Sequence, residues 1–134
     1  MDMEAFNNCY LTGIPLVDRQ HKEIFELINR VETLCRNHQK DKAALLLPRL
    51  GEILRVHVET EERLMVTIGF PSLSHHHEVH DLVRGNFEKM CKQFSGFSER
   101  DLTYFFDSVM RHHLDDMDMQ YIPYYKKWLQ EGGN

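Results

Sequence analysis

The fold can be worked out from one segment, residues 57–80, which reads HVETEERLMVTIGFPSLSHHHEVH. Gly69 lies in its middle, and glycine is the residue that most often ends a helix. On each side of this glycine, two side chains that bind metal ions well stand four residues apart: His57 with Glu61, and His76 with His80. Residues four apart are neighbours on one helix face, so each pair presents two donors toward one point. The segment therefore predicts two helices with a short connection, each carrying a two-donor ligand.

Two segments that precede Gly69 repeat apolar residues at helical spacing. The first runs from about Asp18 to His38, and its recurring inward residues are Ile24, Phe25, Ile28, Val31 and Cys35, with His21 on the same stripe. The second begins with Asp41 as the expected N-cap and ends at Gly69, and Pro48 is expected to kink or restart it. Its inward face consists of Leu46, Leu50, Ile53, His57, Glu61, Leu64 and Ile68. Both segments thus place histidine on a face that should be buried.

The third segment starts near the serines at 72 and 74 and ends before Gly96. Its stripe contains His76, His80, Val83, Phe87, Met90 and Phe94. Positions seven and eleven after His77 are Arg84 and Glu88, which favour solvent. Of the three consecutive histidines, only His76 shares its face with apolar residues, so its two neighbours are expected on the surface.

A fourth segment has Ser98 as its N-cap and Asp101 in its first turn. The residues expected to be buried along it are Leu102, Phe106, Val109 and His113. The tail from Met119 to Asn134 predicts a short helix that caps one end of the molecule. Together the segments predict an all-α fold, an antiparallel up-down-up-down four-helix bundle with a short C-terminal helix, in a single domain over residues 1–134.

The composition suits such a protein and argues against several classes of partner. Hydrophobic residues make up 42% and charged residues 28%, which is typical of a globular protein with a core. Sixteen basic and 21 acidic residues give a formal net charge of −5, which disfavours nucleic acid and anionic membranes. No signal peptide or membrane-spanning run is recognisable, so a cytoplasmic location is expected. Cys9, Cys35 and Cys91 form no CxxC pair, and buried free thiols are expected.

Histidines on inward faces require an explanation. A single buried histidine is usually a satisfied core residue, but several imidazoles and a carboxylate on four inward stripes are costly to bury without partners. A metal ion removes that cost, and an imidazole-rich set suits iron, copper or zinc better than magnesium or calcium. Glu61 and Asp118 are carboxylates that could each bridge two cations. Asp118 follows His113 by five residues, about 140° around an ideal helix, so it reaches inward only if the helix loosens or ends there.

The chain resembles the bacterial hemerythrins over nearly its whole length. The segment Gly13-Ile-Pro-Leu-Val-Asp18-Arg-Gln-His21-Lys is similar to the first-helix signature of that family. The remaining family motifs are HxxxE at His57 to Glu61, HxxxH at His76 to His80, and HxxxxDxxY at His113 to Asp118 and Tyr121. Four motifs in the family's order fill all seven ligand positions.

The resemblance implies two non-haem iron ions, bridged by carboxylates and by an oxo or hydroxo group. By this resemblance, one iron is bound by His76, His80 and His113, the other by His21 and His57, and both by the bridging Glu61 and Asp118. The second iron keeps one coordination position vacant, and molecular oxygen is expected to bind there. The sequence departs from the family at Phe6 and Val109, near which tryptophans would be expected.

These features lead to a functional expectation and two alternatives. The expected function is reversible binding of oxygen for storage, transport or delivery, without enzymatic turnover. One alternative is an oxygen or redox sensor that acts through a separate signalling partner. The other is a di-iron peroxidase or an enzyme that handles nitric oxide, although no general base or substrate cleft is recognisable.

Overall fold

The computed structural model describes residues 12–107 and 118–133 of the chain. Its helices are α2 (Pro15–Arg36), α3 (Lys40–Ala44), α4 (Leu47–Ile68), α5 (Leu73–Lys92), the 3-10 turn η1 (Phe94–Gly96), α6 (Glu99–Phe105), the 3-10 turn η4 (Asp118–Tyr121) and α7 (Ile122–Gln130). No strand occurs among these residues. Not one of these helices combines the length and the apolarity that crossing a membrane requires.

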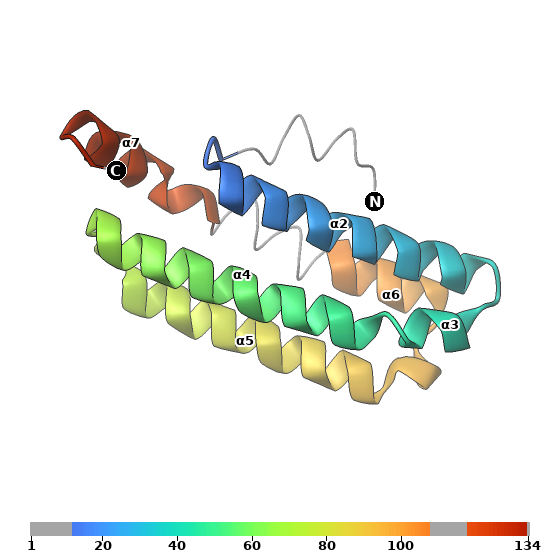
Figure 1. Cartoon of the computed structure of the whole chain (residues 1–134). Coiled ribbons are helices and arrows are strands. Elements are labelled where there is room, and N and C mark those ends of the chain that lie inside the picture. Colours follow the sequence, from blue (N-terminus) through green and yellow to red (C-terminus); the bar gives the residue numbers. More distant parts are fainter. Residues whose placement is uncertain (1–11, 108–117, 134) are drawn as a thin grey trace.

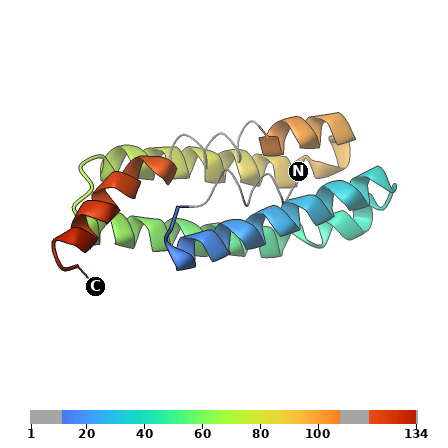
Figure 2. The same ribbon diagram turned by 90° about the horizontal axis from the view of Figure 1, so that it is seen from above.

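The long helices lie antiparallel to their neighbours in sequence (Figure 1). The α2 helix packs against α4, α4 packs against α5, and α6 returns along α2. The short α7 helix lies at the end of the bundle where α4 finishes and α5 begins (Figure 2). The predicted all-α antiparallel bundle with a short C-terminal helix is therefore confirmed.

A compact turn starts α2 three residues before the predicted position. Gly13 has a φ of 82°, which favours glycine, and Pro15 occupies the first turn, where its missing N–H costs no hydrogen bond. The Asp18 carboxylate then accepts hydrogen bonds from Thr12 N, Thr12 Oγ1 and Gly13 N at 2.7, 2.7 and 3.1 Å. The signature segment before His21 thus serves first to start the helix in a fixed orientation.

The predicted second segment is two helices, α3 and α4. Pro48 lies in the first turn of α4, so it restarts the helix and does not kink it. The expected N-cap at Asp41 is wrong, because Gln39 occupies that position and Asp41 lies in the first turn of α3. In that first turn, the Asp41 carboxylate is still close to the positive, N-terminal end of the α3 helix dipole. The α4 helix ends as predicted at Gly69, whose φ is 72°.

Ser98 begins α6 with the predicted cap. Its hydroxyl accepts a hydrogen bond from Asp101 N, and Asp101 Oδ2 accepts one from Ser98 N, both at 3.0 Å. These two bonds satisfy backbone donors at the helix start, and the bond from Ser98 N holds the pKa of the Asp101 carboxyl below its ordinary value.

Two apolar clusters fill the bundle. The α6-end core consists of Ile24, Leu27, Ile28, Val31, Ala43, Leu47, Leu50, Phe87, Met90, Phe94, Leu102, Phe105 and Phe106. The α7-end core consists of Ile14, Val17, Met65, Ile68, Phe70 and Tyr121. Along α2, α4 and α5, the buried residues between these two clusters are polar. The candidate site is therefore a polar layer across the middle of the bundle.

Candidate metal centre

Five of the seven predicted ligands lie in this polar layer. Their exposed fractions are 1% for His21, 2% for His57, 0% for Glu61, 0% for His76 and 2% for His80. Each of α2, α4 and α5 contributes at least one of them. The register argument for the third segment is also confirmed, because His76 is buried whereas His75 and His77 are exposed.

The first group of donors is formed by His21, His57 and Glu61. Their ligand atoms all lie within 4.8 Å of one another. The Nε2 atoms of the two histidines are 3.2 Å apart, and His57 Nε2 is 2.7 Å from Glu61 Oε1. Two nitrogens at about 2.1 Å from one ion stand about 3 Å apart when the angle between them is near 90°. The group therefore fits one cation in size and in donor chemistry.

The second group approaches the same carboxylate from α5. His80 Nε2 lies 3.6 Å from Glu61 Oε1, the oxygen that also faces His57. The His76 ring is 5.6 Å from the His80 ring between centroids. Glu61 is therefore placed between the His57 imidazole of α4 and the His80 imidazole of α5.

Aromatic residues of the α7-end core hold His76 in place. The Phe70 ring meets the His76 ring edge to face, with centroids 5.3 Å apart, and the Tyr121 ring lies 6.3 Å away. Tyr121 is fully buried, so it packs as well as completing the family motif. Phe70 was missed by sequence reasoning, because it lies in the connection after Gly69 and outside every helical stripe.

The outer nitrogens of two candidate ligands contact polar side chains that the sequence reading did not single out. His57 Nδ1 is 3.1 Å from Gln20 Oε1, and His80 Nδ1 is 3.5 Å from Glu62 Oε1. Glu62 also binds the exposed His77 at 2.8 Å. Its hydrogen bond and negative charge, together with Asp81, raise the pKa of His77. Gln20 and Glu62 each directly adjoin a ligand in sequence, which is the one signal that could have found them.

The remaining predicted ligands are described incompletely. His113 lies outside the described residues, as do Phe6, Val109 and Cys9. Asp118 begins the 3-10 turn η4, and its side chain lies outside the described residues. Ligation by these two residues stays a prediction.

The described donors satisfy the chemistry of a transition-metal site. Four imidazoles and one carboxylate converge in a layer that is almost closed to solvent. Burying a carboxylate is costly unless positive charge accompanies it, and a bound cation supplies that charge. Nitrogen-rich donors with a carboxylate suit iron or zinc.

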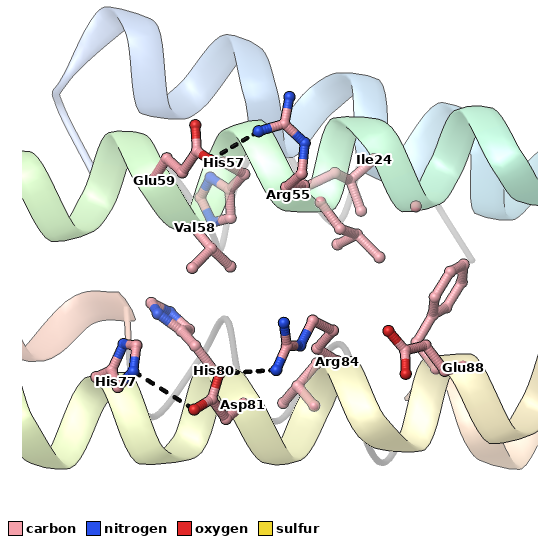
Figure 3. A pocket seen from close by; sticks show the side chains of 14 residues that line it. Ile24, Arg55, His57, Val58, Glu59, His77, His80, Asp81, Arg84 and Glu88 are labelled. Atoms are coloured by element: carbon pink, nitrogen blue, oxygen red, sulfur yellow. Dashed lines mark hydrogen bonds and ion pairs between the residues drawn. The ribbon is translucent and has the colours of Figure 1, made fainter.

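A groove of about 570 Å³ between α4 and α5 leads from the surface to this layer (Figure 3). His57 and His80 line its inner end, and Ile24 of α2 lines it from behind. Its other walls are largely apolar, with Val58 on α4 and Val83 on α5. Charged side chains that line the groove form ion pairs, Arg55 with Glu59 and Arg84 with Asp81. Arg55 also pairs with Glu52, which lies outside the groove.

The two described cysteines are free and partly buried against the α6-end core. Burial raises the pKa of both the Cys35 and Cys91 thiols, which keeps them protonated. The expectation of buried thiols is therefore met only in part for these two residues, and Cys9 lies outside the described residues.

An all-α bundle with a buried layer of imidazoles around a carboxylate defines a class of helical metal-binding proteins. Residues 12–125 match the family model described as "Hemerythrin HHE cation binding domain", and the chain belongs to the hemerythrin family. A protein named Bacteriohemerythrin from Campylobacter jejuni subsp. jejuni serotype O:23/36 is 25% identical over 116 residues, 84% of this chain and 87% of the relative. Another of the same name, from Methylococcus capsulatus, is 26% identical over 115 residues, 84% of this chain and 88% of the relative. No solved structure matches the chain significantly.

Proposed function

We propose that this hemerythrin-family protein holds two non-haem iron ions and binds molecular oxygen reversibly, for storage, transport or delivery. The observation that carries the proposal is the position of Glu61, which has one oxygen 2.7 Å from His57 Nε2 and 3.6 Å from His80 Nε2. A carboxylate between two groups of imidazoles suits a pair of cations, because its charge offsets their repulsion and its oxygens reach both.

The proposed ligand sets are the ones that the family resemblance implies. His21 and His57 would hold one iron, and His76 and His80, with His113, would hold the other. Glu61 and Asp118 would bridge the two. When bound by these residues, an iron pair would supply the electrons needed to hold oxygen reversibly.

The chain's own contribution is to orient the ligands and to exclude water. Fully buried apolar residues flank the polar layer on both sides. They are Val17 and Met65 in the α7-end core and Ile24 in the α6-end core. A dry surrounding disfavours charged species leaving the centre and limits side reactions with water. Past its charged rim, the groove between α4 and α5 gives a small neutral molecule a largely apolar path.

The donor set favours binding over turnover. Ferritin-like di-iron oxidases use Glu-x-x-His pairs and more carboxylates, which stabilise higher oxidation states. The centre proposed here has five histidines and two carboxylates. We therefore propose a binding protein and not an enzyme.

The test is the visible spectrum of the iron-loaded, reduced protein, recorded without oxygen, then in air, then after oxygen is removed. A charge-transfer band that appears in air and disappears on removal of oxygen is the expected result. Irreversible oxidation at the first exposure would instead favour a redox sensor. Steady consumption of peroxide or nitric oxide would favour an enzyme, and either result would overturn the carrier function.

A further inference from the structure

The Gln20 side chain connects the candidate metal centre to the surface of α4. We infer that Gln20 and Thr60 form a hydrogen-bond relay that fixes the direction of the His57 ring and thereby sets the affinity of the His21–His57 half of the centre for metal. The inference depends on metal binding at the proposed centre and not on the binding of oxygen.

The relay begins at a backbone carbonyl. Thr60 Oγ1 donates a hydrogen bond to Val56 O at 2.9 Å, one turn earlier in α4. A carbonyl oxygen only accepts, so the Thr60 hydroxyl proton is committed to it. The hydroxyl oxygen is then left as an acceptor, and Gln20 Nε2 donates to it at 2.9 Å.

The two ends of the Gln20 amide are not equivalent, and this gives the relay its direction. Because Nε2 faces Thr60, Oε1 faces His57 Nδ1, at 3.1 Å. An amide oxygen accepts only, so the ring proton lies on Nδ1 of His57. The other ring nitrogen, His57 Nε2, then presents a lone pair that a cation can accept. This nitrogen faces His21 Nε2 at 3.2 Å and Glu61 Oε1 at 2.7 Å.

The opposite orientation of the amide would work against metal binding. It would place an N–H group of Gln20 against His57 Nδ1, which would then have to accept. The ring proton would move to Nε2 and point into the centre. Thr60 therefore matters, although its hydroxyl is on the outside of the bundle, because it selects one of two amide orientations.

A comparison with His80 shows why His57 needs an orienting third residue and His80 does not. Its outer nitrogen faces the Glu62 carboxylate at 3.5 Å. Both oxygens of a carboxylate accept, so Glu62 imposes the same ring direction in either orientation and needs no third residue. An amide at position 20 brings no negative charge to His57, but unlike a carboxylate it has to be oriented.

The experiment compares Thr60→Val with two controls. Valine keeps the shape of threonine but removes the hydroxyl, so the Gln20 amide loses the group that orients it. Thr60→Ser restores a hydroxyl and should restore the wild-type behaviour. Thr67→Val is the matched control, because Thr67 Oγ1 makes the same bond to Arg63 O, at 2.9 Å in the same helix, away from Gln20.

Metal affinity is the first readout, measured by titrating the metal-free protein with cobalt(II) in competition with a chelator. Gln20→Leu should weaken one of the two bound ions by about 10- to 100-fold, as loss of a group that orients a ligand usually does. Thr60→Val should weaken the same ion several-fold, whereas Thr60→Ser and Thr67→Val should not. Gln20→Glu keeps an acceptor for His57 Nδ1 and should bind at least as tightly as the wild type.

The second readout is the nitrogen NMR spectrum of the histidine rings in zinc-loaded protein. The wild type should show a slowly exchanging proton on His57 Nδ1 and metal on Nε2, and Thr60→Val should accelerate that exchange. Unchanged cobalt affinity and unchanged exchange in Thr60→Val would overturn the relay, as would an equal loss of affinity in Thr67→Val. Neither readout uses oxygen, so a protein that binds metal but no oxygen would contradict the carrier function alone.

Discussion

Glu61 is the residue on which the proposed two-ion centre depends most. Replacing it with glutamine keeps its size but removes the charge that would offset two neighbouring cations. We expect Glu61→Gln to lower the iron content from two ions per chain to one or fewer, measured by elemental analysis of folded protein. Glu59→Gln is the matched control, because Glu59 lies on the same helix but is exposed and pairs with Arg55 at 2.7 Å. Two ions retained in Glu61→Gln would contradict the bridging role.

The sequence predicts some residues of this site well and others not at all. His76 could be chosen over its neighbours because burial follows the helical period of its own segment. The pairing of Gln20 with Thr60 could not be predicted, because the two residues are 40 positions apart and meet only through the way α2 packs on α4. Phe70 was missed for a related reason, since a connection has no period from which its inward residue can be identified.

At the scale of the element, the start of α6 depends on the reciprocal cap between Ser98 and Asp101. Ser98→Ala should lower the free energy of unfolding by about 1 kcal/mol, because the Asp101 N–H loses its acceptor. The pKa of Asp101 is below its ordinary value, so its contribution is present above the unfolded pKa of about 3.9 and is lost as pH falls through the folded pKa.

Asp101→Asn tests this pH dependence. The wild type should be more stable than the variant near pH 6. The difference should begin to shrink below about pH 4 and disappear only when the pH falls below the lowered pKa of the folded Asp101 carboxyl. The measurement is urea unfolding at a series of pH values. A difference that stays constant across this range would mean that the charge of Asp101 does not contribute.

The groove between α4 and α5 leads to a prediction about the rates at which oxygen binds and leaves. Val58→Trp and Val83→Trp should fill part of the path to His57 and His80, and so slow both association and dissociation of oxygen with little change in affinity. Leu82→Trp is the control, because Leu82 precedes Val83 on α5 but is 65% exposed and does not line the groove. Stopped-flow rates equal to those of the wild type in both groove variants would show that oxygen arrives by another route.

At the scale of the whole molecule, the bundle is two apolar cores separated by a polar layer. Apolar periodicity predicts most of the α6-end core, since it locates the inward faces of α2, α4, α5 and α6. Of the α7-end core it predicts only Ile68, because Ile14 and Val17 precede the expected start of the first segment and Met65 is buried where Leu64 was expected. It does not locate the ends of helices equally well: α2 begins before Asp18 and α3 is separate from α4, because turn hydrogen bonds and Pro48 decide these positions.

The same division predicts how metal should affect stability. Without metal, the buried imidazoles and Glu61 weaken the connection between the cores, and the α7-end core is the smaller of the two. Metal binding should therefore protect backbone amides from hydrogen exchange mainly at the α7 end, in the last turn of α4, the first half of α5 and α7. Amides of the α6-end core should change little, because that core holds the other halves of α2, α4 and α5 together on its own. At a metal concentration about 100 times the dissociation constant, one bound ion should also add about 2.7 kcal/mol to the free energy of unfolding. Hydrogen exchange of the backbone amides, measured with and without a chelator, tests the predicted difference between the two ends. Equal protection at both ends would show that the bundle responds to metal as one unit.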